Sequence, residues 1–307
     1  MKLSIVTTLY QSALFIDEFY QRSTAVAKQL AGEDYEFILV NDGSSDDTLN
    51  LAVRLAEQDS HVIVLDLSRN LGHHKAMMTG LMYAKGEHVF LIDSDLEEEP
   101  EWVTLFYEKM TECNCDMVYG IQKIRKGGKF ERLAGYFYYK ILHLFMGINI
   151  PQSIVTARLM TRRFIKGFLQ FSETEIFFGG LTLLTGFEKI PVHIKKHSSS
   201  PTVYTFRKKI NLLVDSITSF SDVPLKGIFY IGNLIFLISF IYVLYLILNW
   251  FLFSLPPSGY TLLIASIWLL GGLTISLMGV IGIYLSKIFL EIKRRPITIV
   301  KAIYGYK

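Results

Sequence analysis

Residues 87–100 read EHVFLIDSDLEEEP, and this stretch decides the class of fold. An apolar run with the length of a β-strand ends directly in Asp93-Ser94-Asp95. Alternate residues of a strand share a face, so two carboxylates at a strand end can approach one hard cation together. The stretch therefore predicts a buried strand with a cation-assisted site at its carboxyl end.

Further strand-like runs surround this one in the first 120 residues. KLSIVTT, YEFILVN, HVIVLDL and DMVYG alternate with amphipathic segments such as FIDEFYQRSTAVAKQL and DDTLNLAVRLAEQ. Such alternation is typical of an α/β fold with a mostly parallel sheet, whose ligands bind at the carboxyl ends of the strands. Those ends carry Thr8, Asp42, residues 66–69 and residues 93–95. The sequence thus predicts a site where these polar residues meet.

The composition indicates a part embedded in a membrane. Of the 307 residues 51% are hydrophobic and only 19% are charged, and the mean hydropathy is +0.34. Residues 227–253 and 261–286 carry no formal charge, and each run exceeds the roughly 20 residues that cross a ~30 Å hydrocarbon core. Buried helices of a soluble protein are the alternative, but two adjacent runs of this length favour a transmembrane helical hairpin.

The distribution of charge around these runs predicts the topology. Lys and Arg flank the hairpin at Arg207, Lys208, Lys209 and Lys226, and again at Lys287, Lys293, Arg294, Arg295, Lys301 and Lys307. The loop between the runs is uncharged, so both chain ends are expected in the cytoplasm of a multi-pass inner (cytoplasmic) membrane protein without a signal peptide. We expect a cytoplasmic domain at 1–206, a juxtamembrane amphipathic segment at 207–226, and at 227–307 the hairpin with a basic tail.

The chain divides into an acidic and a basic part. Residues 1–120 hold 8 Lys and Arg against 21 Asp and Glu, whereas residues 121–307 hold 23 against 7. The basic part suits an anionic lipid surface or a phosphorylated lipid. Nucleic acid is not expected as a partner, because no recognisable reading motif accompanies the charge. Cys113 and Cys115 are too few for a disulfide scaffold, and they lack the further His or Cys residues that a zinc site needs. This cysteine usage fits a reducing compartment.

An apolar stripe with helical spacing lies between the two parts, at about 129–147. A core helix is the usual interpretation of such a stripe. Its aromatic residues and its basic neighbours equally favour an amphipathic helix in the membrane interface.

Short motifs in a fixed order connect these features. They are N-D-G-S at 41–44, S-R-N-L-G at 68–72, D-S-D-L at 93–96, Y-G at 119–120, R-L-M at 158–160 and S-F-S-D-V-P-L at 219–225. With the two terminal apolar runs, nearly the whole chain resembles the family 2 glycosyltransferases. The resemblance is greatest to polyprenyl-phosphate glycosyltransferases related to dolichyl-phosphate mannose synthase. It implies the GT-A (Rossmann-like) fold.

The resemblance also implies roles for individual residues. Asp42 would contact the nucleotide base or ribose, Asp93 the ribose or phosphate region, and Asp95 would bind Mg²⁺ or Mn²⁺ on the donor diphosphate. Further donor contacts are implied for Thr8, Tyr10, Ser68, Arg69, Asn70 and Ser94. The acceptor-phosphate arginines would be Arg125, Arg132 and Arg158, since an arginine fork donates two parallel hydrogen bonds to phosphate. The alternatives are interfacial anchors for all three and, for Arg158, the orientation of a carboxylate.

The implied activity is the inverting, metal-dependent transfer of one sugar from a nucleotide-sugar to a polyprenyl phosphate at the cytoplasmic membrane face. The acceptor would be undecaprenyl phosphate in a bacterium, and the product a lipid-linked sugar for modification of cell-envelope glycans. A UDP-sugar is favoured over a GDP-sugar, and a homo-oligomer is a further expectation. A processive synthase is disfavoured because no Q-x-x-R-W motif occurs, and a non-catalytic membrane scaffold because Asp42, Asp93 and Asp95 are intact.

Departures from the family pattern leave the transferred sugar open. Four residues differ from those usual in relatives: Thr8, Ser12, Gln122 and Thr156. Relatives usually carry an acidic residue at the position of Thr156, and a basic segment in place of residues 196–201. His73 and His74 stand where Lys-Glu is more usual, either as solvated or paired side chains or as a donor-phosphate contact. The acidic residues 97–99 are interpreted as the start of the following helix, where the helix dipole favours them.

Overall fold

The structure is a computed structural model that describes residues 2–122, 154–171, 173, 176, 178–196, 223–253 and 260–305. Arg125, Arg132, the segment 129–147 and nearly all of 207–226 lie outside the described residues. The chain forms two compact units. One comprises Met1–Tyr139, Ile148–Tyr204 and Arg295–Lys307, and the other comprises Lys140–Gly147 and Thr205–Arg294.

The first unit is built on a mixed sheet of eight strands in the order β7-β5-β6-β4-β1-β2-β3-β8. Its centre is parallel: β1 (Leu3–Leu9) pairs with β2 (Tyr35–Asn41) and β4 (His88–Leu91), and β2 pairs with β3 (Val62–Leu67). Every residue of β1, β2 and β3 is buried, as expected of parallel strands covered on both faces. The prediction of an α/β fold with a mostly parallel sheet is confirmed.

The outer strands add antiparallel pairs. β6 (Ile154–Thr161) runs antiparallel to β4 and to β5 (Met117–Gln122), and β7 (Lys189–Ile194) runs parallel to β5. Arg158 of β6 pairs with Leu91 of β4 on one side and Tyr119 of β5 on the other. This register brings Arg158 to the end of the strand that leads into Asp93.

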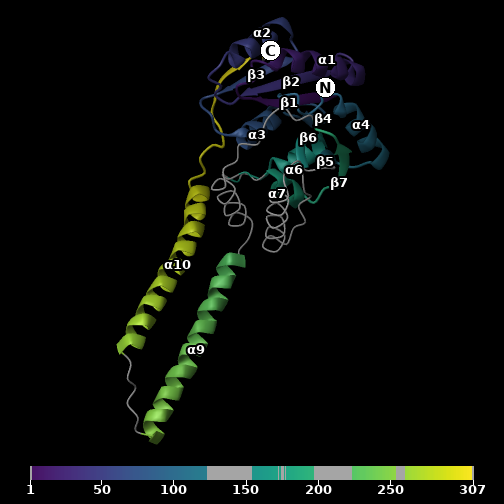
Figure 1. Cartoon of the computed structure of the whole chain (residues 1–307). Coiled ribbons are helices and arrows are strands. Elements are labelled where there is room, and N and C mark those ends of the chain that lie inside the picture. The colour runs from purple at the N-terminus through teal and green to yellow at the C-terminus, as the bar shows by residue number, and fades with distance from the viewer. Residues whose placement is uncertain are drawn as a thin grey trace. The chain divides into compact units, whose positions relative to one another are not determined.

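Helices cover both faces of the sheet (Figure 1). On one face α1 (Ile16–Ala31) contacts both α2 (Thr48–Gln58) and α4 (Trp102–Cys113), and the three helices bury a core that includes Phe19, Phe37 and Phe106. On the other face α3 (His73–Tyr83) lies against β1 and β2. The shorter helices α6 (Arg162–Phe168) and α7 (Phe178–Leu184) follow β6.

The close approach of α3 depends on a glycine. A Cβ atom at Gly80 would collide with Val6 of β1 and lie 3.0 Å from Val40 of β2. Because Gly80 removes that obstacle, α3 packs tightly on the strands. Its first residue, His73, is thereby held beside the carboxyl end of β1.

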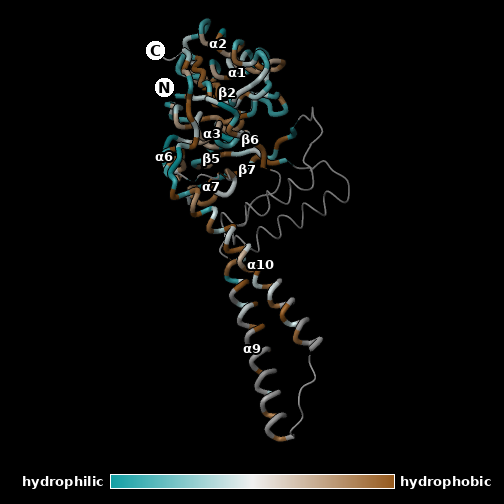
Figure 2. Tube along the Cα trace, turned by 90° about the vertical axis from the view of Figure 1, so that its left-hand side faces the viewer, coloured by the Kyte–Doolittle hydropathy of each residue, from teal (hydrophilic) through white to brown (hydrophobic). Residues whose placement is uncertain are grey.

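The second unit contains two long apolar helices, α9 (Val223–Phe253) and α10 (Tyr260–Ile292). Among the described residues, one segment, Leu273–Ile292 with a mean hydropathy of 1.9, is long and apolar enough to cross a membrane. Within α9, the search of the described residues finds a shorter apolar stretch, Val223–Gly232. In Figure 2 the hydropathy colours along α10 run mainly from white to the brown of apolar residues. One candidate span is therefore found, and the hairpin of two spans stays a prediction.

The residues after α10 differ from the expected basic tail. Val300–Tyr304 form strand β8, which pairs antiparallel with β3 at one edge of the sheet. The end of the chain thus belongs to the same unit as the predicted site. The hydropathy pattern gave no sign of this strand, because its pairing partner lies more than 200 residues away in the sequence.

Candidate active site

The carboxyl ends of the central strands bring the predicted site residues together. Leu9 of β1 pairs with Asn41 of β2, which pairs with Asp66 of β3, and Val6 of β1 pairs with Leu91 of β4. The polar residues at these strand ends therefore lie at one edge of the sheet. This is the position at which open α/β sheets bind ligands.

Asp42 holds the loop 68–72 in place. Its Oδ1 accepts a hydrogen bond from the Leu71 amide at 2.7 Å, and its Oδ2 accepts one from the Gly72 amide at 3.0 Å. Burial raises the pKa of Asp42, and the two amides act in the opposite direction. A Cβ atom at Gly43, whose φ is +65°, would lie 2.5 Å from the Asn70 nitrogen. The N-D-G motif is thus fitted to the S-R-N-L-G loop, with both Asp42 oxygens already hydrogen-bonded.

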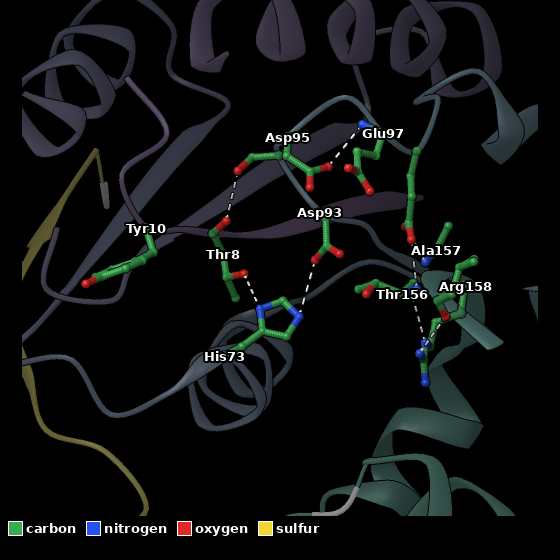
Figure 3. Close-up of polar contacts among 12 residues, drawn as sticks. Thr8, Tyr10, His73, Asp93, Asp95, Glu97, Thr156, Ala157 and Arg158 are labelled. Atoms are coloured by element: carbon green, nitrogen blue, oxygen red, sulfur yellow. Dashed lines mark hydrogen bonds and ion pairs between the residues drawn. The ribbon is translucent and has the colours of Figure 1, made fainter. Parts of the chain in front are cut away.

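His73 joins the first strand to the acidic motif (Figure 3). Its Nδ1 lies 2.9 Å from the Thr8 hydroxyl oxygen, and its Nε2 lies 3.3 Å from Asp93 Oδ1. A proton on Nε2 would face the carboxylate and leave Nδ1 to accept a hydrogen bond from Thr8. Of the two interpretations of His73, the structure favours a paired side chain, one that fixes the orientation of Asp93.

Thr8 and Ser94 are also linked. The Ser94 hydroxyl donates to the Thr8 carbonyl oxygen at 3.1 Å and lies 3.1 Å from the Ser12 hydroxyl. Thr8, Ser12 and Ser94 are all buried. Thr8 and Ser12, two departures from the family pattern, therefore belong to one polar cluster with the D-S-D motif.

Asp93 and Asp95 suit a hard cation. Asp95 Oδ1 accepts a hydrogen bond from the Glu97 amide at 3.0 Å, and burial, with Asp93 and Glu97 adding to it, raises the pKa of Asp95. Among the described residues, Asp93 Oδ1 is buried without a hydrogen-bond partner, since the His73 contact is an ion-pair distance only. Oxygen ligands with a surplus of negative charge are what Mg²⁺ and Mn²⁺ prefer.

The described residues do not form a complete metal site by themselves. They include no group of three or more His, Cys, Asp or Glu side chains arranged around a metal position. Mg²⁺ is usually held by one or two carboxylates together with substrate phosphates. The pair Asp93 and Asp95 therefore fits a cation that shares its remaining ligands with the phosphates of a substrate.

Glu98 lies inside the protein, against β6. Its side chain is 0% exposed, and its two oxygens accept hydrogen bonds from the amides of Thr156 at 3.0 Å and Ala157 at 2.7 Å. Burial raises the pKa of Glu98 to about 7, and the negative charge of the nearby Asp93 acts in the same direction. Lys196 Nζ lies 3.6 Å from Glu98 and 3.0 Å from Glu97. The interpretation of residues 97–99 as an acidic helix start is wrong for Glu98, because this residue ties the loop after β4 to β6.

Arg158 is buried, and two of its nitrogens donate hydrogen bonds to backbone carbonyls. Its Nε donates to the Thr156 carbonyl at 2.8 Å, a hydrogen bond drawn in Figure 3. Its Nη2 donates to the Val155 carbonyl at 3.0 Å. The guanidinium lies 4.6 Å from the centre of the Phe178 ring. Burial lowers the pKa of Arg158 to about 10, although Glu98 and Asp93 oppose that change. These described hydrogen bonds go to backbone carbonyls of β6 and not to a carboxylate, and the buried position does not suit an interfacial anchor. The role of Arg158 towards an acceptor phosphate stays a prediction.

The remaining predicted donor residues lie at the rim of the site. Tyr10 is 52% exposed, and Ser68, Arg69 and Asn70 are exposed on the loop that Asp42 holds. The structure thus gathers Thr8, Asp93 and Ser94 in the interior of the site. Sequence reasoning missed two features: the contacts of His73 with Thr8 and Asp93, and the burial of Glu98 against β6. The runs His73-His74 and Glu97-Glu98-Glu99 were the local signals that pointed to these positions.

His74, the second histidine, points elsewhere. Its Nδ1 lies 3.0 Å from the Ile176 carbonyl oxygen, and its ring is 6.4 Å from that of Phe178. Burial lowers the pKa of His74, which favours the neutral ring. The two adjacent histidines therefore differ in their contacts: His73 lies at ion-pair distance from Asp93, whereas His74 contacts a backbone carbonyl.

Comparison with known proteins agrees with this geometry. The family model described as glycosyl transferase family 2 matches residues 4–169. A Mycobacterium tuberculosis protein assigned to the glycosyltransferases is 45% identical, over 99% of this chain and 89% of its own length. The SfII prophage-derived bactoprenol glucosyl transferase of Shigella flexneri is 31% identical, over 98% of each chain.

Among solved structures, a mannosyltransferase from Pyrobaculum calidifontis in complex with GDP-Man and Mn²⁺ has a TM-score of 0.50 at 14% identity. The match covers 71% of this chain and 63% of that one. At this identity the likeness concerns the fold alone, and it agrees with a GT-A-like α/β architecture.

Proposed function

We propose, since this chain belongs to glycosyl transferase family 2 and is a glycosyltransferase, that it transfers one sugar from a nucleotide-sugar to a polyprenyl phosphate at the cytoplasmic face of the membrane. The observation that carries the proposal is the pair Asp93 and Asp95 at the end of β4, in a site bordered by the Asp42-held loop. The likeness to a bactoprenol glucosyl transferase over nearly the whole of both chains supports the acceptor. The product would be a lipid-linked sugar for the modification of cell-envelope glycans.

The donor half of the site consists of described residues. Asp95 would hold a divalent cation on the donor diphosphate, and Asp93, oriented by His73, would lie beside the ribose and phosphates. Such a cation, when bound, supplies positive charge that neutralises a departing nucleoside diphosphate. A relative in fold carries GDP-Man and Mn²⁺ together, which is consistent with a divalent cation in this site.

The acceptor half needs no general base. A phosphate monoester has a second pKa of about 6, so its oxygen is ionised near neutral pH and can attack directly. The new bond joins that oxygen to the anomeric carbon, the bond from this carbon to the diphosphate breaks, and the electron pair leaves with the nucleoside diphosphate. One such displacement inverts the anomeric configuration. Arg125 and Arg132, outside the described residues, are proposed to hold the acceptor phosphate.

The membrane part would keep the site close to its lipid substrate. The segment Leu273–Ile292 meets the length and hydropathy of a span, and we propose that the run at 227–253 forms the other arm of a hairpin. The positions of Lys and Arg around both runs favour chain ends in the cytoplasm, on the side where nucleotide-sugars are made.

Release of nucleoside diphosphate tests the proposal. The purified chain in lipid nanodiscs is incubated with Mg²⁺ or Mn²⁺ and a panel of nucleotide-sugars, with and without undecaprenyl phosphate. We expect release that depends on the lipid phosphate with one of the donors. No release above a heat-inactivated control with any donor would favour a non-catalytic membrane protein and would overturn the proposal.

Replacement of His73 tests its contact with Asp93. Exchange of His73 for Phe keeps a ring but removes both nitrogens, so Asp93 loses its partner and transfer should fall by about tenfold or more, since misplacement in an active site is costly. The matched control is His74→Phe, which alters the neighbouring ring whose bond goes to a backbone carbonyl. Steady-state transfer rates and thermal unfolding check the pair. Equal activity of both variants would exclude a positioning role for His73.

Cysteine labelling tests the topology. In a chain with Cys113 and Cys115 replaced by alanine, single cysteines are placed at Ser258, at Lys307 and at Gln29 on α1. An impermeant thiol reagent outside the cell should label the first position only. Labelling of Lys307 from outside would contradict the proposed hairpin.

A further inference from the structure

The strand after the last apolar helix lies beside the loop that borders the donor site. β8 pairs with β3 in the register Leu65↔Ile303 and Asp66↔Ala302, with an irregularity between Asp66 and Leu67. β3 ends there, and the chain enters the S-R-N-L-G loop. In Figure 1 the yellow end of the chain runs along β3.

The pairing continues beyond β3 into the loop itself. The Ser68 amide donates a hydrogen bond to the Ile299 carbonyl oxygen at 2.9 Å. At the other end of the loop, the amides of Leu71 and Gly72 donate to Asp42. Arg69 and Asn70 lie exposed between these two attachments. One of the two attachments of the loop is therefore supplied by the C-terminal segment.

Two side chains of the same segment reach neighbouring elements of the site. The Thr298 hydroxyl oxygen lies 2.6 Å from that of Thr79, a buried residue of α3, the helix that begins at His73. Lys301 Nζ lies 3.8 Å from Asp66 Oδ2, and Asp66 Oδ1 accepts a hydrogen bond from Asn41 at 2.8 Å. Residues 298–301 thus contact β3, the loop and α3 at the donor edge.

The geometry points to a role for this segment in the proposed function. We propose that residues 298–305 are a positioning element of the donor site, which holds the loop 68–72 in the conformation that binds the nucleotide-sugar. Fixing a loop at both ends reduces the conformational entropy that is lost when a ligand orders it. The inference rests on the proposed function, and it adds that the chain beyond the membrane helices contributes to donor affinity.

Protection of a sheet edge is the purely structural alternative. An added strand covers unpaired backbone groups and prevents aggregation, whatever the loop beside it does. That role predicts lower stability on removal of β8 without a specific loss of donor binding. Donor affinity and exchange of the loop amides therefore separate the two roles.

Two variants of the full chain weaken the segment. Gly305 has a φ of +74°, and a Cβ atom there would collide with the Val62 carbonyl oxygen, so Gly305→Val should displace the end of β8. Its matched control is Gly186→Val, because Gly186 has a φ of +71° with nothing within 4 Å of a Cβ atom. Thr298→Val, a milder change that removes only the hydroxyl bonded to Thr79, is matched by Thr111→Val on α4, whose hydroxyl donates within its own helix.

Donor binding and hydrogen exchange provide the measurements. The probes are the nucleotide-sugar selected by the release assay, with Mn²⁺, in calorimetry, and deuterium uptake of residues 68–72 without ligand. Gly305→Val should raise the donor Kd by about tenfold, and Thr298→Val by a smaller factor. Both should speed exchange in 68–72, while the two controls match the native chain.

The outcomes separate this inference from the proposed function. If the native chain binds no nucleotide-sugar, the proposed function fails and the inference fails with it. If the native chain binds its donor, and Gly305→Val and Thr298→Val unfold at lower temperature but bind that donor as tightly, only the inference is overturned. Should Gly305→Val fail to fold, Thr298→Val decides by the same readouts.

Discussion

Replacement of Asp95 by asparagine is expected to lower sugar transfer by about a hundredfold or more, because a neutral amide cannot hold a divalent cation against the donor diphosphate. The chain should still fold and enter the membrane, since Asp95 accepts a hydrogen bond from the Glu97 amide that an asparagine oxygen can also accept. Chelation of the native chain with EDTA should give the same loss, and added Mn²⁺ or Mg²⁺ should reverse it. Transfer rates with and without chelator provide the measurement.

A matched exchange separates the cation from a general effect of lost charge. Asp17→Asn on α1 makes the same chemical change at an exposed position and should transfer at the native rate. Unfolding temperatures of all three proteins should agree within a few degrees. Native activity of Asp95→Asn in the presence of chelator would show that transfer does not depend on a metal held by Asp95.

Free polyprenol should not replace polyprenyl phosphate as acceptor. An alcohol needs a base to take its proton near neutral pH, whereas the phosphate is already ionised. Three of the carboxylates described in the site face other groups. Asp42 and Glu98 each accept hydrogen bonds from two backbone amides, and Asp93 Oδ1 lies 3.3 Å from His73 Nε2. We therefore expect transfer to the alcohol at least about a hundredfold slower than to the phosphate, in line with the usual contribution of general-base catalysis.

Parallel assays of the two lipids with the same donor provide this measurement. Replacement of Arg125 or Arg132 by alanine should weaken use of the lipid phosphate while donor binding persists. Thr156→Ala should be tolerated, because the described hydrogen bonds of Thr156 involve its backbone nitrogen and oxygen. Comparable rates with the alcohol would mean that a base exists elsewhere in the chain, and the assignment of the acceptor would be wrong.

Short-range patterns made the sheet and its functional edge predictable. β1, β2 and β3 are rich in apolar residues and buried along their whole length, and polar residues lie at or directly after their carboxyl ends. Because parallel strands align these ends, Thr8, Asp42 and Asp93 could be placed at one edge before any geometry was known. The same reasoning predicted α1 and α2 from their amphipathic spacing.

Contacts between distant segments could not be predicted in this way. The burial of Glu98 follows from its hydrogen bonds with the amides of Thr156 and Ala157 on β6, and nothing in the local sequence distinguishes it from the half-buried Glu97 and Glu99. β8 is short, and its basic and apolar residues resemble a membrane-flanking tail until β3 supplies a partner. Arg158 was assigned by motif alone, and only the strand register places its guanidinium among backbone carbonyls.

The mass and linkage of the lipid product test the central claim most directly. The native chain is incubated with undecaprenyl phosphate, Mn²⁺ and the nucleotide-sugar that supports diphosphate release, and the extracted lipid is analysed by mass spectrometry and NMR. The account predicts a lipid heavier by a single sugar residue, joined through the phosphate with the anomeric configuration opposite to that of the donor. An unchanged lipid, a product with several sugars, or a retained configuration would contradict it.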